Sequence, residues 1–185
     1  MENSDFGYLR LATDLDQLRI LAWRNDPNIR SMMYSQHEIS LDEHNDWWQR
    51  VKISNDHLAF MYISNGIETG FVSFSQVSRL SGTAFWAFYA QPNAPRGTGS
   101  KMEFLALEQA FSVENFRKLN CEVLEKNSKV IQLHKKFGFQ QEGIFSSHIL
   151  IDEVFQDVHR LAIFKSTWEK IRKEKHSELL RRISK

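Results

Sequence analysis

The sequence predicts a single α/β domain in which a mixed sheet of about seven strands is flanked by helices. Three observations predict it: a run of three apolar strands in the middle of the chain, helical apolar spacing on either side of that run, and the overall element order βαα-βββ-α-β-α-ββ. A length of 185 residues supports one core and is short for two domains. We expect the domain to span residues 1–165 and an amphipathic helical extension to occupy residues 166–185.

The first elements are a strand over Tyr8 to Ala12 and a helix for which Thr13 or Asp14 supplies the N-cap. Asn25-Asp26-Pro27 ends this helix, because proline disfavours helical backbone at the residue before it. The apolar residues that share one face of the helix are Leu15, Leu18 and Ala22.

A second helix begins after Ser40, because Ser40 is followed three residues later by Glu43, the spacing of a capping box. Its apolar and aromatic face contains His44, Trp47, Trp48 and Val51.

The stretch from His57 to Ala90 reads as three strands, LAFMYIS, TGFVSFSQVS and TAFWAFYA. The turn signals Asn65-Gly66 and Ser81-Gly82 separate them, which predicts an antiparallel meander.

Helical spacing returns after Gly99, where the apolar face consists of Met102, Leu105, Ala106, Gln109, Ala110 and Val113. The remaining elements follow in order: a strand over 119–124, a helix over 127–137 that Gly138 ends, two strands over 139–151 and 154–164, and a charged helix of about 17 residues from Ser166 onward.

Composition narrows the classes of function. The formal net charge is +1, from 24 basic and 23 acidic side chains, so no global field favours nucleic acid or an anionic membrane. The single cysteine, Cys121, excludes an internal disulfide and a multi-cysteine metal site, and we interpret it as a small buried strand residue. We expect no metal and a cytoplasmic location, because no secretory signal or membrane-spanning run is recognisable.

The segment from Phe85 to Lys101 carries the strongest chemical signal. An aromatic strand runs into a proline-bounded loop and then into a helix start, where Gly97 and Gly99 allow backbone N–H groups to approach an anion and Arg96 adds positive charge. A tight turn without a ligand is the alternative. The glycine spacing fits neither a Walker loop nor a dinucleotide-binding fingerprint.

The element order, the RGTG corner and the later segment NSKVIQLHKKFGF resemble the GNAT superfamily of N-acetyltransferases. The segments WRNDPNIRSMMYSQHEISLDEH, FWAFYAQP and VFQDVHRLAIFKSTW resemble the members that act in pseudaminic acid biosynthesis. This resemblance implies transfer of an acetyl group from acetyl-CoA to the 4-amino group of a UDP-linked 4-amino-4,6-dideoxy sugar, a step toward flagellin glycosylation. The amine would attack the thioester directly.

The resemblance also implies a splayed gap between two strands that holds acetyl-CoA. Phe88 and Ala90 would bind its pantetheine and acetyl amides, and Asn127 would contact it from the start of a helix, where capping is the alternative role. The pyrophosphate would be held by Arg96, Gly97, Thr98, Gly99, Ser100 and Lys101. Ala94 departs from the family, which has Gln or Arg at that position.

His134 occupies the position at which many family members have a tyrosine that protonates the departing thiolate. Histidine has an ordinary pKa near 6.5, so it donates weakly at neutral pH unless its surroundings raise that pKa. We interpret His134 as the catalytic residue that protonates or binds the thiolate, with a solvated histidine as the alternative.

The same resemblance implies an acceptor pocket formed by Arg24, Met33, Tyr34, His44 and Tyr89. Three of these residues have an alternative role in packing or on the surface. Arg24 could be a surface residue, His44 could pack on the helix face that contains Trp47 and Trp48, and Met33 could belong to the core. No general base is identifiable, and an ordered water could serve.

Three other functions remain as alternatives: acetylation of a protein N-terminus, acetylation of a small amine, and binding of acyl-CoA without turnover. The C-terminal segment KIRKEKHSELLRRISK interleaves acidic with basic residues, so we expect a solvated or oligomer-contacting helix rather than a nucleic-acid contact. We expect no membrane partner and leave a homodimer open.

Overall fold

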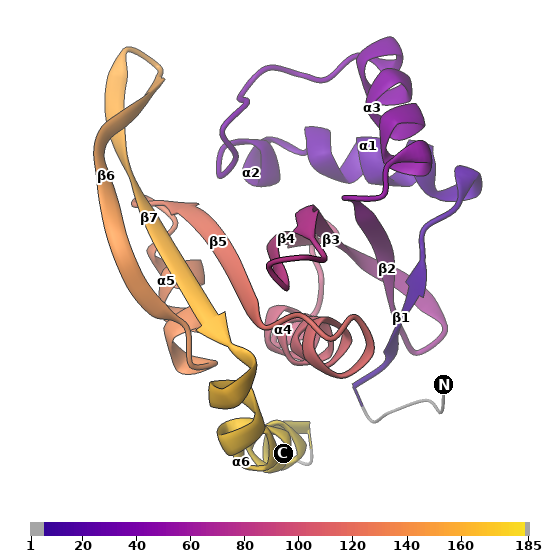
Figure 1. Ribbon diagram of the computed structural model, residues 1–185. Helices are drawn as coiled ribbons and strands as arrows, with labels where there is room; N and C mark the ends of the chain where they lie inside the picture. Colours follow the sequence, from indigo (N-terminus) through magenta and orange to yellow (C-terminus); the bar gives the residue numbers. More distant parts are fainter. Residues whose placement is uncertain (1–5, 184–185) are drawn as a thin grey trace.

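The computed structural model describes residues 6–183, which form a seven-stranded mixed sheet with helices on both faces (Figure 1). The order across the sheet is β1-β2-β3-β4-β5-β7-β6, and only β4 and β5 are parallel. The strands are β1 (Tyr8–Leu11), β2 (Leu58–Ser64), β3 (Ile67–Ser78), β4 (Thr83–Ala90), β5 (Lys118–Leu124), β6 (Gln140–Ile151) and β7 (Val154–Phe164). The predicted fold class is confirmed.

The parallel pair β4 and β5 separates soon after it forms. The two strands are in register only where Thr83–Phe85 meets Lys118–Asn120. Beyond that point β4 continues alongside β3 and β5 continues alongside β7, so the two strands diverge (Figure 1). The sheet therefore contains the predicted splayed gap.

Helices cover both faces. The N-terminal group consists of the 3-10 turn η1 (Asp14–Asp16), α1 (Gln17–Asn25), α2 (Pro27–Arg30) and α3 (Leu41–Ile53). The other group consists of α4 (Thr98–Glu108), the π-helical turn η2 (Gln109–Val113), α5 (Ser128–Lys136) and α6 (Lys165–Ile183).

Side-chain alternation along β2 shows how the core divides. Phe60 and Tyr62 lie in the large cluster with α4 and α6, whereas Met61 and Ile63 lie in a second cluster with α1 and α3. Because successive strand residues point to opposite faces, both faces of the sheet are buried. Cys121 is 2% exposed in the large cluster, as predicted.

The predicted apolar face of the first helix is wrong. Leu15 and Leu18 are 92% and 68% exposed, while Ile20 and Trp23 are buried. The reason is η1, because a 3-10 turn advances three residues per turn and so shifts the face that α1 presents to the sheet. The short helix α2, which Pro27 begins, was also not predicted.

Ser40 caps α3 as predicted, since its side chain accepts a hydrogen bond from the Glu43 N–H. In a full capping box the Glu43 carboxylate would accept a bond from the Ser40 N–H. Here that carboxylate lies 3.0 Å from His37 Nε2 instead.

The long fourth helix keeps its predicted face only as far as Ala110. Val113 is 60% exposed because η2 closes with a bond from Glu114 N to Gln109 O, which is an i to i+5 turn.

The final helix packs on α4, where Trp168 is buried and its Nε1 donates to Glu108 Oε1 at 2.8 Å. Residues 184–185 of the predicted extension lie outside the described residues. Of the helices in residues 6–183, none has both the length and the apolar character that crossing a membrane requires.

Candidate active site

The gap between β4 and β5 opens into a pocket that crosses the plane of the sheet. Strand residues of both faces line it, and they are joined by residues of α5 and of the loop after α2. The lining residues are Met32, Met33, Trp86, Ala87, Phe88, Cys121, Glu122, Val123, Asn127, Val130 and His134. The pocket is therefore lined from both faces of the sheet.

The predicted anion cradle forms the start of α4. Gly97 has a φ of 93°, which favours glycine, and its carbonyl accepts the first intrahelical bond from Lys101 N at 3.2 Å. The Thr98 N–H and hydroxyl both bond Pro95 O. The N–H groups of Gly99 and Ser100 are those that a helix leaves without an acceptor of its own, so they suit an anion.

The cradle lies close to the gap. A Cβ added to Gly99 would lie 3.5 Å from Leu133 of α5 and 3.8 Å from Phe88 of β4. The start of α4, the gap strand β4 and the helix α5 therefore meet at one place.

Asn127 begins α5 through its backbone. Its carbonyl accepts bonds from Val130 N at 3.0 Å and Ile131 N at 3.2 Å, while its side chain makes no capping bond. The side chain lines the gap pocket. The backbone of Asn127 thus caps α5, and its side chain is not used for capping.

His134 is buried, so the alternative of a solvated histidine is wrong. It is 2% exposed, and its Nδ1 lies 2.9 Å from Glu103 Oε1 of α4. The rings of Trp86, Phe88 and Phe139 surround it at centroid distances of 5.2, 5.9 and 5.0 Å.

The environment of His134 changes its acidity. Burial by itself lowers the pKa of the imidazole, but the Glu103 carboxylate and the neighbouring Cys121 outweigh this and raise the pKa to about 10. Burial likewise raises the pKa of Glu103, an effect that the charge of His134 opposes. Because the bond between the two groups is short and both are buried, their mutual attraction favours the charged pair and keeps the pKa of His134 raised.

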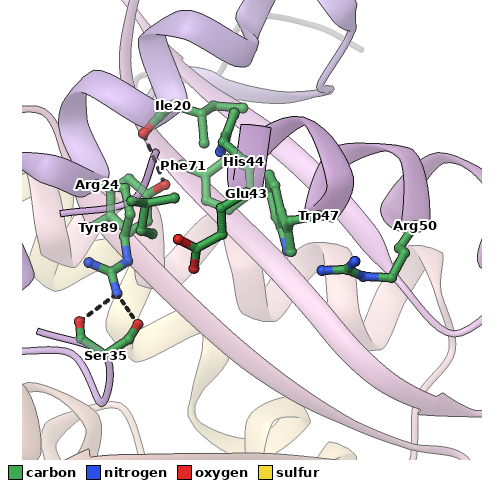
Figure 2. Close-up of a pocket in the computed structure, with 10 residues that line it drawn as sticks. Ile20, Arg24, Ser35, Glu43, His44, Trp47, Arg50, Phe71 and Tyr89 are labelled. Atoms are coloured by element: carbon green, nitrogen blue, oxygen red, sulfur yellow. Dashed lines mark hydrogen bonds between the residues drawn. The ribbon is translucent and has the colours of Figure 1, made fainter. Parts of the chain in front are cut away.

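A second cavity, of about 310 Å³, lies between α1, α3 and the sheet (Figure 2). Three predicted acceptor residues line it, namely Arg24, His44 and Tyr89. The other lining residues were not predicted as site residues: Ile20, Ser35, Ile39, Glu43, Trp47, Arg50 and Phe71. Helical spacing could have indicated Trp47, which lies three residues after His44 on the same face of α3.

Arg24 is held at the edge of this cavity. Its Nη2 donates to Ser35 O at 3.0 Å and to Ser35 Oγ at 2.8 Å, as Figure 2 shows. Nη1 is buried and has no hydrogen-bond partner among residues 6–183. Burial lowers the pKa of Arg24, although a guanidinium remains charged at neutral pH.

His44 both packs against Trp47, with the two rings 5.1 Å apart, and lines the second cavity. It is 3% exposed, and burial lowers its pKa, so the imidazole is neutral at pH 7. Nε2 has no partner within the described part of the chain, which leaves it available to a ligand.

The remaining predicted residues lie elsewhere. Met33 lines the gap, and the Tyr34 hydroxyl donates to Glu122 Oε2 on β5 at 2.8 Å, so neither lines the second cavity. Of the two β4 residues, Phe88 lines the gap, whereas Ala90 pairs with Gly70 of β3 and does not line it.

Comparison with known proteins gives a family match. Residues 8–140 match the model of a family described as "Acetyltransferase (GNAT) domain". The spermidine N(1)-acetyltransferase of Vibrio cholerae is 24% identical over 147 residues, which are 78% of this chain and 84% of that protein. The protein of that name from Escherichia coli K12 is 25% identical over 107 residues, 57% of this chain and 58% of its own length.

Solved structures show the same fold. The crystal structure of the Vibrio cholerae spermidine N-acetyltransferase with CoA and spermine has a TM-score of 0.82 at 23% identity, covering 89% of this chain and 99% of that one. A dodecameric structure of the Vibrio cholerae enzyme has a TM-score of 0.76 at 22% identity, covering 89% and 97%.

Proposed function

Because the chain belongs to the GNAT acetyltransferase family and is an acetyl-CoA-dependent N-acetyltransferase, we propose that it acetylates a primary amine of a small molecule. The observation that carries this proposal is the position of the gap. It adjoins the cradle at the start of α4, and Met33 of the gap is separated by only one residue from Ser35 of the second cavity.

In this proposal the acetyl-CoA lies in the gap. The N–H groups of Gly99 and Ser100 bind the pyrophosphate, with Arg96 and Lys101 adding charge. The backbone of Phe88 and the side chain of Asn127 bind the pantetheine arm where β4 no longer pairs with β5. A free strand edge suits this, because its N–H and C=O groups need partners.

The acceptor amine then approaches from the cavity between α1 and α3 and attacks the thioester carbonyl. The amine must be neutral to attack, and the nearby Arg24 charge favours the neutral form by lowering the amine's pKa. His44 Nε2, as an unprotonated acceptor, can hold an N–H or O–H of the acceptor.

The comparisons favour the small-amine alternative over the UDP-sugar interpretation, because the relatives named above are spermidine acetyltransferases. The nucleotide-sugar acceptor and a role in flagellin glycosylation are unsupported by them. Spermidine and spermine are therefore the first acceptors to test.

One observation favours a second class of acceptor, an amine that also carries an anionic group. The lining of the cavity includes Arg24 and Arg50 and a single carboxylate, Glu43, which is near the neutral His44 (Figure 2). A positively charged polyamine gains little binding energy from a lining with two arginines. A phosphate or carboxylate can pair with Arg24 Nη1, which has no hydrogen-bond partner among the described residues. A nucleotide-linked amino sugar belongs to this class.

The test measures release of the CoA thiol from acetyl-CoA with three acceptor sets: polyamines, amino sugars linked to UDP, and peptides with a free N-terminus. Turnover with polyamines alone supports the first acceptor class, and turnover with the amino sugars alone supports the second. Turnover with peptides alone contradicts a small-molecule acceptor.

A further inference from the structure

We propose that Glu103 is a positioning residue that holds His134 as the proton donor to the departing CoA thiolate. This inference rests on the proposed function, because it concerns the same acetyl transfer. Glu103 makes no contact with the gap pocket itself and acts through the imidazole.

The two residues join the helices that flank the gap. Glu103 belongs to α4, whose start forms the cradle, and His134 belongs to α5, whose start carries Asn127. Glu103 is 0% exposed, and its Oε1 lies 2.9 Å from His134 Nδ1. A carboxylate this deep in an apolar helix face is costly unless it is paired.

The pairing fixes which nitrogen faces the chemistry. Nδ1 is engaged by Glu103, and the rings of Trp86, Phe88 and Phe139 restrict rotation of the imidazole. His134 nevertheless lines the gap pocket beside Asn127. Nε2 is therefore the nitrogen on the side of the gap, where the Cys121 thiol, which also hydrogen-bonds the imidazole, is its neighbour.

The proton balance of the step follows from this geometry. Attack of the amine forms the C–N bond, and collapse of the tetrahedral intermediate breaks the C–S bond. The thiolate takes the proton from His134 Nε2, which leaves a neutral imidazole whose Nδ1–H donates to the Glu103 carboxylate. The proton lost by the attacking nitrogen passes to solvent and later restores Nε2–H, so the enzyme returns to its starting state.

Few other titratable groups face the imidazole. The Cys121 thiol of β5 hydrogen-bonds it, while the neighbours from β4 and from the residue before β6 are the aromatic rings already named. On α5 itself, Lys135 and Lys136 are exposed. Among the described residues Glu103 is thus the nearby carboxylate that pairs with His134.

A purely structural role makes a different prediction. Buried ion pairs contribute little net stability. If Glu103 had only a structural role, an isosteric neutral side chain would therefore preserve the packing and leave the acetyl transfer unchanged. In Glu103→Gln the side chain keeps its shape and loses only the charge. If Glu103 positions and charges His134, this variant changes the acidity of His134 and the pH dependence of turnover.

The first experiment titrates the histidine ring resonances of the free protein by NMR, which needs no acceptor. The wild type should show one buried histidine that keeps its proton well above pH 7, and His134→Gln identifies that resonance by its loss. In Glu103→Gln the same ring should titrate at or below pH 6.5. A wild-type His134 that titrates at or below pH 6.5 would overturn the proposal even if the variant does not fold.

The second experiment compares the pH profiles of kcat, with KM for acetyl-CoA as the control. At pH 8 a histidine with a pKa of 6.5 is protonated in about 3% of molecules, so Glu103→Gln should lower kcat at least about 30-fold with KM changed less than twofold. At pH 6 the loss should be much smaller. An equal loss at both pH values would contradict the proposal.

A matched variant separates proton donation from packing. His134→Tyr supplies a donor whose pKa near 10 needs no carboxylate, so in that background Glu103→Gln should change kcat less than twofold. The same loss in both backgrounds would mean that Glu103 acts on packing. If no acceptor is acetylated at all, the proposed function fails while the titration still decides the role of Glu103.

Discussion

The hydroxyl of Tyr34 donates a 2.8 Å hydrogen bond to Glu122 Oε2, which ties the loop after α2 to β5 across the gap. The other oxygen of Glu122 pairs with Arg160 of β7 at 2.8 Å, and the Arg160 guanidinium lies 4.0 Å from the centre of the Phe85 ring of β4. The loop that brings Met33 to the gap is thereby fixed to the strands on either side of it.

Tyr34→Phe should weaken binding of acetyl-CoA without slowing chemistry. The bond is partly exposed, so its loss should cost about 1 kcal/mol and raise KM for acetyl-CoA roughly fivefold with kcat nearly constant. Steady-state kinetics measure both, and Tyr8→Phe of β1 is the control. Equal KM values for the two variants would show that the loop does not depend on this bond.

Arg24→Gln should redistribute acceptor preference. Loss of a guanidinium that pairs with an anionic group costs about 2 kcal/mol or more, so kcat/KM for an anionic amine should fall at least about 30-fold, while that for spermidine should stay level or rise. The matched control is Arg19→Gln on the same helix, since Arg19 pairs with Glu68 at 3.1 Å and does not line the cavity. If kcat/KM falls equally for both acceptors, the charge of Arg24 does not determine acceptor preference.

Arg96→Glu should weaken the pyrophosphate site selectively. The substitution replaces attraction by repulsion at the start of α4, so KM for acetyl-CoA should rise about tenfold at low salt and less at high salt. S-acetylpantetheine lacks the pyrophosphate, and its kcat/KM should change less than twofold. An equal effect on both acetyl donors would place the pyrophosphate elsewhere.

The order of the strands and of the longer helices was predictable because most of their boundaries carry a strong local signal. Asn65-Gly66 and Ser81-Gly82 separate the strands of the meander, and Ser40 caps α3 as its spacing with Glu43 indicates. The apolar face of α1 was not predictable. It depends on the 3-10 turn η1, in which Asp16 is held by hydrogen bonds from Arg10 of β1.

The candidate site was likewise predictable only in part. The start of α4 and Asn127 follow from motifs, and the structure brings them to one gap. Glu103 was missed, although a carboxylate directly between the apolar residues Met102 and Phe104 of a helix was a visible signal. Its partner, His134, lies 31 residues away, and no local pattern connects the two.

Asp16→Asn should destabilise the N-terminal layer in a way that depends on pH. Asp16 is 2% exposed and accepts bonds of 2.7 and 2.8 Å from Arg10, together with bonds from the Thr13 N–H and hydroxyl. The Arg10 hydrogen bond is the largest influence, and it lowers the pKa of Asp16 despite burial.

The sign of the pH dependence follows from that lowered pKa. The pair stabilises the native state fully above the ordinary carboxyl pKa of 3.8, and this contribution is lost as the pH falls through the lower native value. At pH 7 the variant should therefore lose about 2–3 kcal/mol of unfolding free energy, and its difference from the wild type should shrink below pH 3.8. Urea unfolding at each pH measures the difference, with exposed Asp46→Asn of α3 as the control. Because a carboxylate that acted only through its shape would give a constant difference, a pH-independent loss would show that the charge of Asp16 does not hold β1 to η1.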